Sequence, residues 1–153
     1  MSDAFSADQT AALGSVLDLL IPPSGDGRLP GAGEAGVGAR IAESAGRDAG
    51  LRGTVAAGLA ALDEAARTRG ASGFVALAAA DRLAALQAIA PAQPGFVPSL
   101  IFHTYAGYYQ QGRVLEGLGL EARPPFPKGY EMEPFDESLL AQVRRRDKMW
   151  RDA

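Results

Sequence analysis

The pattern of apolar and polar positions along most of the chain is that of amphipathic helices. Leu13 and Leu17 lie one helical turn apart, with small and apolar residues continuing the same stripe on either side. Ser6 and Gln9 precede this stripe at the spacing of a capping box, in which two side chains satisfy the first free backbone amides of a helix. Together these residues predict a helix over about residues 7–20.

Similar stripes and capping residues predict further helices. Asp48 and Asp81 are the expected N-terminal caps of two of them, and Gly70 and Pro91 are typical signals for their ends. No segment shows the strict alternation of a β-strand, and the Gly- and Pro-rich stretch at 24–38 predicts a long loop. The further helices are expected at about residues 37–44, 48–69, 81–90, 98–111, 113–118 and 137–147. The sequence therefore predicts an all-α fold of about five to seven helices.

The sequence changes character after Gly95, because nine of the eleven aromatic residues follow it. Residues 121–134 hold four of the ten prolines and show almost no periodicity, which predicts an extended arm. We therefore expect a single domain over residues 1–153. In it, a helical body at 1–94 is followed at 95–153 by a helix, the extended Pro- and aromatic-rich arm and a terminal helix.

The composition fits one globular domain and narrows the range of partners. A chain of 153 residues with 47% hydrophobic residues is long enough to bury one core. The formal net charge of −3 gives no overall attraction for a polyanion, so nucleic acid is not an expected partner. The sequence has no Cys, which removes disulfides and Cys-based metal sites, and His103 is the single imidazole.

Neither a membrane span nor an export signal is evident in the sequence. No apolar run approaches the roughly 18 residues that cross a bilayer, so direct membrane insertion is not expected. The N-terminus has neither a basic segment before an apolar run nor a twin arginine. We expect a cytoplasmic protein if Met1 is the natural start, and a periplasmic or membrane-associated one if a signal was removed.

Three patterns resemble catalytic or ligand sites, and for each the simpler interpretation is favoured. His103 lies one turn after Ser99, but no nucleophile elbow accompanies them, so a packed or interfacial histidine is expected. A G-x-G-x-x-G string at 31–36 lacks the preceding strand that dinucleotide binding needs. The carboxylates at 131–137 lack the spacing of a calcium loop. No catalytic, cofactor or metal residue is therefore predicted.

The aromatic and basic residues of the C-terminal third are typical of a protein interface. Trp, Tyr and Arg are enriched at interface hot spots, and prolines reduce the entropy that an arm loses on binding. Packing back onto the domain is the simpler alternative for part of the set. The candidates for contact with a partner are His103, Tyr105, Tyr108, Tyr109, Phe126, Tyr130, Phe135, Trp150 and Arg151.

Several segments stand in an order and spacing that are specific when taken together. They are F-S-A-D-Q-T-A-A-L-G-S-V-L-D-L-L-I-P at 5–22, G-L-A-A-L-D at 58–63, H-T-Y-A-G-Y-Y at 103–109, P-K-G-Y at 127–130 and M-W-R at 149–151. Over nearly the whole chain they resemble the small subunit, subunit 3, of gluconate 2-dehydrogenase and of related membrane-linked sugar and alcohol dehydrogenases.

The resemblance implies a helical, cofactor-free subunit that is not catalytic by itself. Its implied partner in a heterodimer is a large subunit of the glucose-methanol-choline (GMC) oxidoreductase type, which carries FAD and oxidises a sugar, glycoside or alcohol. Family members often bear a twin-arginine signal, which is missing here, and help the large subunit to fold, take up flavin and be exported. The expected function is a chaperone-like, structural and maturation role.

The residues also leave open an alternative of a different class. A stand-alone helical enzyme or small-ligand binder could use His103 with Tyr105 or Tyr109 in a pocket. Such a protein would be monomeric and saturable by its ligand, whereas a subunit would depend on its partner. A helical adaptor for some other protein is a third interpretation.

Overall fold

The prediction of an all-α fold is confirmed. The computed structural model describes residues 4–124, 126, 128–129 and 131–146, and within these ranges it contains seven α-helices, two short 3₁₀ helices and no strand. Residues 1–123 form one compact unit and residues 124–153 form a second. From here on these units are called the body and the arm, so the body also includes residues 95–123, which were predicted as part of the C-terminal segment. The two units are described separately below.

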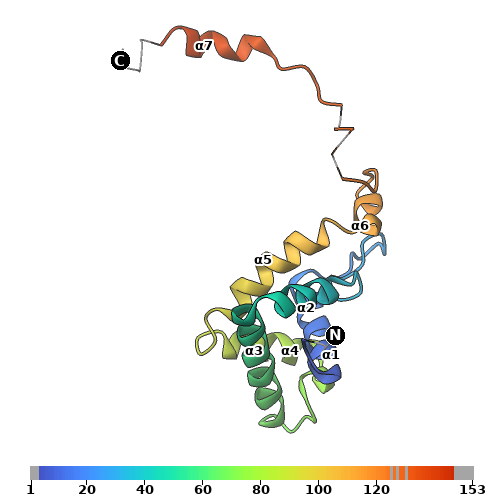
Figure 1. The fold of residues 1–153 in the computed structure, drawn as a ribbon, viewed down its shortest axis with the longest axis vertical. Helices are drawn as coiled ribbons and strands as arrows, with labels where there is room; N and C mark the ends of the chain where they lie inside the picture. Colours follow the sequence, from blue (N-terminus) through green and yellow to red (C-terminus); the bar gives the residue numbers. More distant parts are fainter. Residues whose placement is uncertain (1–3, 125, 127, 130, 147–153) are drawn as a thin grey trace. The chain divides into compact units, whose positions relative to one another are not determined.

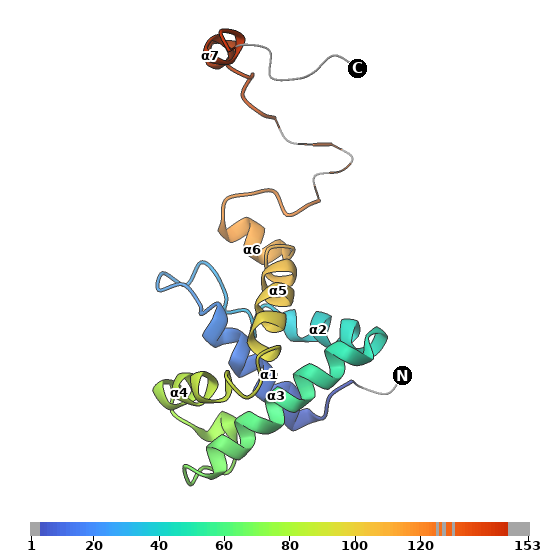
Figure 2. The ribbon, with the colours of Figure 1, turned by 90° about the vertical axis from the view of Figure 1, so that its left-hand side faces the viewer.

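The body contains six α-helices, shown from two sides in Figures 1 and 2. They are α1 (Ala7–Leu20), α2 (Val37–Arg47), α3 (Ala49–Arg67), α4 (Ala79–Ile89), α5 (Phe96–Tyr108) and α6 (Gly112–Gly117), with the 3₁₀ helix η1 (Phe74–Ala76) before α4. The long helix α3 packs against α1, α2, η1, α4 and α5, and α1 also packs against α2, α4 and α5. The core therefore lies between α3 and the helices around it.

The first helices begin where the local sequence predicts. Ser6 and Gln9 form the expected capping box of α1, with Ser6 Oγ accepting the Gln9 N–H at 3.2 Å and Gln9 Oε1 accepting the Ser6 N–H at 3.0 Å. Asp48 caps α3, because its Oδ1 accepts the backbone N–H groups of Gly50 and Leu51. These caps stabilise helix ends with side chains only two or three residues away, which explains why the sequence alone reveals them.

Several predicted helix boundaries are wrong, and α5 ends at Tyr108, three residues before the predicted end at 111. Asp81 does not cap α4: the N-cap is Ala78, and Asp81 lies in the first turn, where its charge favours the helix dipole. Arg82 fixes this start instead, because its guanidinium donates to the carbonyl oxygens of Leu77 and Val75. Helix α2 also extends to Arg47, three residues further than expected, and ends directly at Asp48.

Close helix crossings hold α5 in the body. A Cβ atom at Gly58 of α3 would lie 2.2 Å from the Phe96 ring, so only glycine lets these helices approach so closely. At the other end of α5, a Cβ atom at Gly107 would lie 3.1 Å from Cγ1 of Val37 on α2. Phe96 and Val37 are buried, so α5 is wedged between two neighbouring helices.

The Gly- and Pro-rich loop at 24–36 is attached to the body at several points. The Gly33 N–H donates to Asp18 Oδ1 at 2.8 Å, and the Ala32 N–H donates to the Ile21 carbonyl at 2.9 Å. Arg28 donates to the Gly117 carbonyl at 2.8 Å, which ties the loop to α6. The predicted loop is therefore present, but it is a packed part of the body.

The arm contains little regular structure among its described residues. Within the arm, the described residues from 124 to 136 form no helix, as the prolines predict. The 3₁₀ helix η2 (Glu137–Leu139) and the helix α7 (Leu140–Arg144) follow. The Asp136 side chain accepts the Ser138 N–H at 2.9 Å and so caps η2. The predicted helix at 137–147 is thus confirmed in its position but is shorter and begins as a 3₁₀ turn.

Candidate protein-interaction surface

Helix α5 carries apolar residues around most of its circumference, but only one face is buried. Phe96, Leu100, Thr104, Gly107 and Tyr108 are buried and lie three or four residues apart along that face. Their neighbours in the core come from α1, α2 and α3. The sequence motif H-T-Y-A-G-Y-Y at 103–109 therefore contains three buried residues, Thr104, Gly107 and Tyr108, and its remaining residues are not fully buried.

Tyr108 joins the buried face of α5 to the loop. Its hydroxyl donates to the Pro30 carbonyl at 2.7 Å, and only 2% of the residue is exposed. Burial raises the pKa of the Tyr108 phenol, and the neighbouring Tyr109 raises it further. Sequence analysis placed Tyr108 among the partner contacts, but the structure shows a core residue that anchors the loop.

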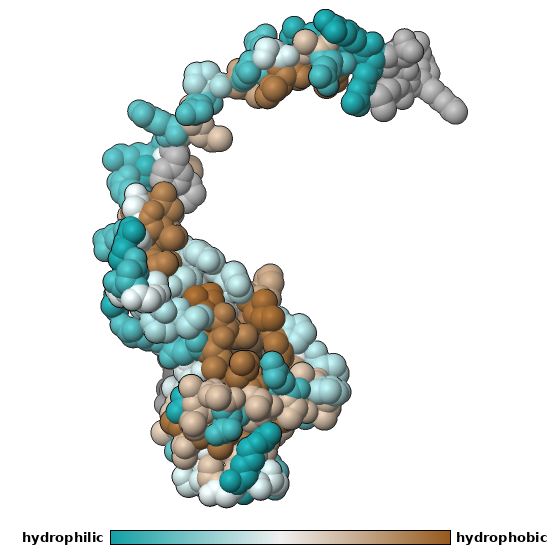
Figure 3. All heavy atoms as spheres, turned by 180° about the vertical axis from the view of Figure 1, so that it is seen from behind, coloured by the Kyte–Doolittle hydropathy of each residue, from teal (hydrophilic) through white to brown (hydrophobic). Residues whose placement is uncertain are grey.

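The other side of α5, together with its C-cap residue Tyr109, exposes four large hydrophobic residues. The exposed fraction is 70% for Phe102, 42% for Ile101, 49% for Tyr105 and 48% for Tyr109. We call these four residues the α5 aromatic face. The rings of Tyr105 and Tyr109 lie 6.0 Å apart, and Tyr109 also meets the ring of Tyr108 edge to face at 5.2 Å. Hydrophobic atoms also gather into a visible patch on one side of the body (Figure 3).

A small depression lies between α2 and α5. Its volume is about 110 Å³. Its polar lining residues are Arg40 and Ser44 from α2, His103 from α5, and Gln110, which follows the end of α5. Arg40 Nη1 donates to Gln110 Oε1 at 2.8 Å across the depression. We call it the α2–α5 depression. Its lining contains His103 but neither Tyr105 nor Tyr109, so the pocket of the alternative enzyme hypothesis is not assembled here.

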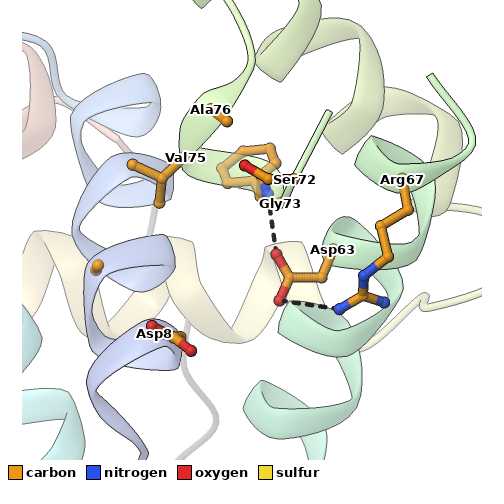
Figure 4. Close-up of a pocket in the computed structure, with 9 residues that line it drawn as sticks. Asp8, Asp63, Arg67, Ser72, Gly73, Val75 and Ala76 are labelled. Carbon is orange, nitrogen blue, oxygen red and sulfur yellow. Dashed lines mark hydrogen bonds and ion pairs between the residues drawn. The ribbon is translucent and has the colours of Figure 1, made fainter. Parts of the chain in front are cut away.

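A larger hollow lies between α1, α3 and η1 (Figure 4). Its volume is about 500 Å³, and Asp8, Asp63 and Arg67 are among its polar lining residues. Asp63 Oδ1 accepts the Phe74 N–H at 2.9 Å, and its Oδ2 lies 4.0 Å from Arg67 Nη2. Asp63 therefore holds η1 against α3, and this structural role accounts for its position.

The G-x-G-x-x-G string has a structural explanation. A Cβ atom at Gly31 would lie 2.3 Å from Asp18 Oδ1, and one at Gly33 would lie 2.4 Å from the Gly14 carbonyl oxygen. Gly36 has φ of 80°, a left-handed conformation that side chains disfavour. The three glycines let the loop lie directly on α1 and turn into α2, which is a packing requirement and not a phosphate cradle.

The remaining candidate contact residues divide between the two units. His103 is half-buried, and Tyr105 and Tyr109 belong to the α5 aromatic face. In the arm, Phe126 is 85% exposed and Phe135 is 64% exposed. Tyr130, Trp150 and Arg151 lie outside the described residues. Phe102, Ile101 and Arg40 were not among the residues predicted to contact a partner, because nothing in their types shows that they lie exposed beside the predicted contact residues of α5.

Two further properties concern the described residues only. No helix among them is long and apolar enough to cross a membrane. Within the same ranges, no group of three or more His, Asp or Glu side chains is placed to hold a metal ion.

Comparison with known proteins identifies the family. The family model described as gluconate 2-dehydrogenase subunit 3 matches residues 7–117, which include all six helices of the body. No curated protein and no solved structure matches the chain. The matched segment covers well over half of the chain and includes H-T-Y-A-G-Y-Y at 103–109, whereas P-K-G-Y at 127–130 and M-W-R at 149–151 lie outside it. The chain therefore belongs to the gluconate 2-dehydrogenase subunit 3 family, a family of small subunits of dehydrogenase complexes.

Proposed function

We propose that this chain is the non-catalytic small subunit of an FAD-dependent dehydrogenase complex acting on a sugar, glycoside or alcohol. In this proposal the large subunit is of the GMC type, holds the flavin and performs the oxidation. The small chain stabilises the large subunit and aids its maturation. Family membership supports the role of a subunit, and the α5 aromatic face supports a protein contact.

The α5 aromatic face is the observation that carries the proposal. Exposed apolar residues that cluster on one element are typical of interaction sites, because an apolar patch that no partner covers would favour aggregation. Aromatic side chains supply a large contact area with few rotatable bonds, and they dominate interface energies. Phe102 is the most exposed large hydrophobic residue among the described residues of the body.

The proposed mechanism is thermodynamic linkage. A small subunit that binds the folded, flavin-loaded large chain, and does not bind its unfolded form, shifts the folding equilibrium by mass action. The small chain needs no reactive group for this effect. It needs a surface that is already ordered before the partner arrives, and the wedged position of α5 between α2 and α3 supplies that order.

Coexpression tests the proposal. The flavin-dependent dehydrogenase chain is produced alone and together with the small chain, and its soluble yield, flavin absorbance per polypeptide and dehydrogenase activity are compared. We expect all three to rise with the small chain present. If the large chain alone is equally soluble, equally flavin-saturated and equally active, the proposal is wrong.

A surface variant connects the effect to α5. The double substitution Phe102→Asp and Tyr105→Asp places two charges on exposed positions, so the small chain should still fold, but its affinity for the large chain should fall at least about 30-fold. Leu83→Asp on α4 is the matched control, because Leu83 is 45% exposed and lies outside this face. Circular dichroism and thermal unfolding of the isolated variants check that the fold is intact.

A further inference from the structure

We infer that the α2–α5 depression receives a carboxylate side chain of the dehydrogenase partner, next to an apolar residue that packs on the α5 aromatic face. This inference rests on the proposed function and specifies the chemistry of the partner segment. Three properties of the depression carry it: a positioned arginine, a lining without acidic groups, and direct continuity with the aromatic face.

Arg40 is held in position before any partner binds. A Cβ atom at Gly107 would lie 3.7 Å from Cδ of Arg40, so the aliphatic stem of Arg40 lies over the bare backbone of Gly107. The guanidinium at the end of this stem donates from Nη1 to Gln110 Oε1 at 2.8 Å. Gly107 thus admits the arginine to the surface of α5, and Gln110 fixes where its charged group lies. A fixed guanidinium loses less conformational entropy on binding than a free one.

The charge of the depression favours an anionic group. Its polar lining consists of Arg40, Ser44, His103 and Gln110, and it includes no carboxylate. The nearest acidic residue along α2, Glu43, forms an ion pair with Arg47 at 2.7 Å. The hydrogen bond from Arg47 and the positive charges of Arg47 and Arg40 lower the pKa of Glu43, but Glu43 does not line the depression. A guanidinium has five N–H donors, and the contact with Gln110 uses one of them. The remaining donors can form the paired hydrogen bonds that arginine makes with a carboxylate.

The contrast with the rest of the chain strengthens this assignment. The whole sequence has a formal net charge of −3, so a cationic depression is not a consequence of general basicity. Its volume of about 110 Å³ is several times that of a water molecule and suits one side-chain group, not a nucleotide or a sugar.

The depression and the α5 aromatic face form one continuous surface. The ring of His103, which lines the depression, meets the ring of Phe102 edge to face at a centroid distance of 5.2 Å. A partner segment with an acidic residue close to an apolar residue can therefore occupy both places at once. The apolar contact excludes water from the charged pair, and the charged pair sets the register of the segment on the helix.

The test uses the purified small chain and the flavin-containing dehydrogenase chain with which it is coexpressed. Arg40→Gln removes the charge from an exposed position, and Arg52→Gln on α3 removes the same charge from an exposed position outside the depression. Dissociation constants are measured for each variant at low and high NaCl, about 0.05 and 0.5 M. Arg40→Lys is added because it keeps the charge and loses the paired donors.

We expect Arg40→Gln to weaken binding at least about tenfold at low salt and to reduce the salt dependence of the dissociation constant. Arg40→Lys should lie between Arg40→Gln and the wild type, and Arg52→Gln should stay within about twofold of the wild type. If the wild type binds but Arg40→Gln has the same affinity and the same salt dependence, the inference is wrong while the proposed function stands. If the wild type does not bind the large chain at all, both are wrong.

Discussion

Tyr108, the last residue of α5, and Tyr109, its C-cap, are adjacent and chemically identical, yet their side chains lie in different surroundings. Tyr108 is 2% exposed and donates to the Pro30 carbonyl, whereas Tyr109 is 48% exposed and contacts the neighbouring tyrosine rings. The same division separates Leu100 from Ile101. A single helix therefore supports the fold with one face and presents aromatic surface with the other. Changes on the two faces should affect different quantities: stability on one and complex formation on the other.

The largest effect on stability is expected from the pair of neighbouring aliphatic residues. Leu100→Ala removes a fully buried side chain and should lower the free energy of unfolding by about 2 to 5 kcal/mol, because a cavity remains in the core. Ile101→Ala removes a side chain that is 42% exposed and should cost less than about 1 kcal/mol. Urea denaturation of the isolated chain measures both.

The affinity for the dehydrogenase chain should show the reverse order within this pair. Ile101→Ala should weaken the complex, while the fraction of Leu100→Ala protein that is folded should bind normally. If Leu100→Ala and Ile101→Ala lost equal stability, the two faces of α5 would not differ in their contribution to the fold.

The tyrosine pair should give a smaller difference of the same kind. Tyr108→Phe deletes the hydroxyl that satisfies the buried Pro30 carbonyl and should cost about 1 to 2 kcal/mol, since that acceptor is left without its donor. Tyr109→Phe should change the thermal midpoint very little, because its ring is half exposed. Differential scanning calorimetry of the two variants at neutral pH makes the comparison.

The same pair predicts how stability depends on alkaline pH. Burial raises the pKa of Tyr108 above the ordinary value of 10.0, so the folded state holds this proton more tightly than the unfolded state does. This stabilisation is complete below pH 10 and is lost as the pH rises through the higher folded pKa. Tyr108→Phe should therefore show a flatter decline of stability above pH 10 than Tyr109→Phe. If the stability of both variants declined equally steeply above pH 10, this prediction would be wrong.

The smallest effect is expected at Thr104, and its sign is opposite. Its side chain is fully buried, and its hydroxyl oxygen has no hydrogen-bond partner among the described residues. Thr104→Val replaces the hydroxyl by a methyl group of similar size, so we expect the free energy of unfolding to rise by about 1 kcal/mol. A lower unfolding midpoint for Thr104→Val in urea would show that this hydroxyl does have a partner.

Sequence predicts best those features that depend on neighbouring residues. The capping box of α1 and the Asp48 cap of α3 involve side chains within three residues of the backbone groups that they bind, and both were predicted. The start of α4 was misplaced because Asp81 is a good capping residue by type. The actual start depends on Arg82, which reaches back to Leu77 and Val75. Local preference was thus overridden by a contact that leaves no pattern in the sequence.

The surface could be predicted only in part, because burial is a tertiary property. Leu100 and Ile101 are both apolar, and nothing in their types indicates which one is buried. The Tyr108 contact with Pro30 spans 78 positions, and the Arg40 contact with Gln110 spans 70. The resemblance indicated the correct family. It did not separate the scaffold tyrosine from the exposed ones.

The alternation of scaffold and surface residues along α5 also constrains how this helix can change during evolution. Substitutions at Phe102, Tyr105 or Tyr109 alter the surface without moving the residues that pack in the core. One inserted or deleted residue, however, rotates everything after it by about 100° around the helix axis. Tyr108 would then leave Pro30, and the loop would lose its attachment. Relatives should therefore differ by replacements within α5 and keep its length, which allows partner preference to diverge while the fold is maintained.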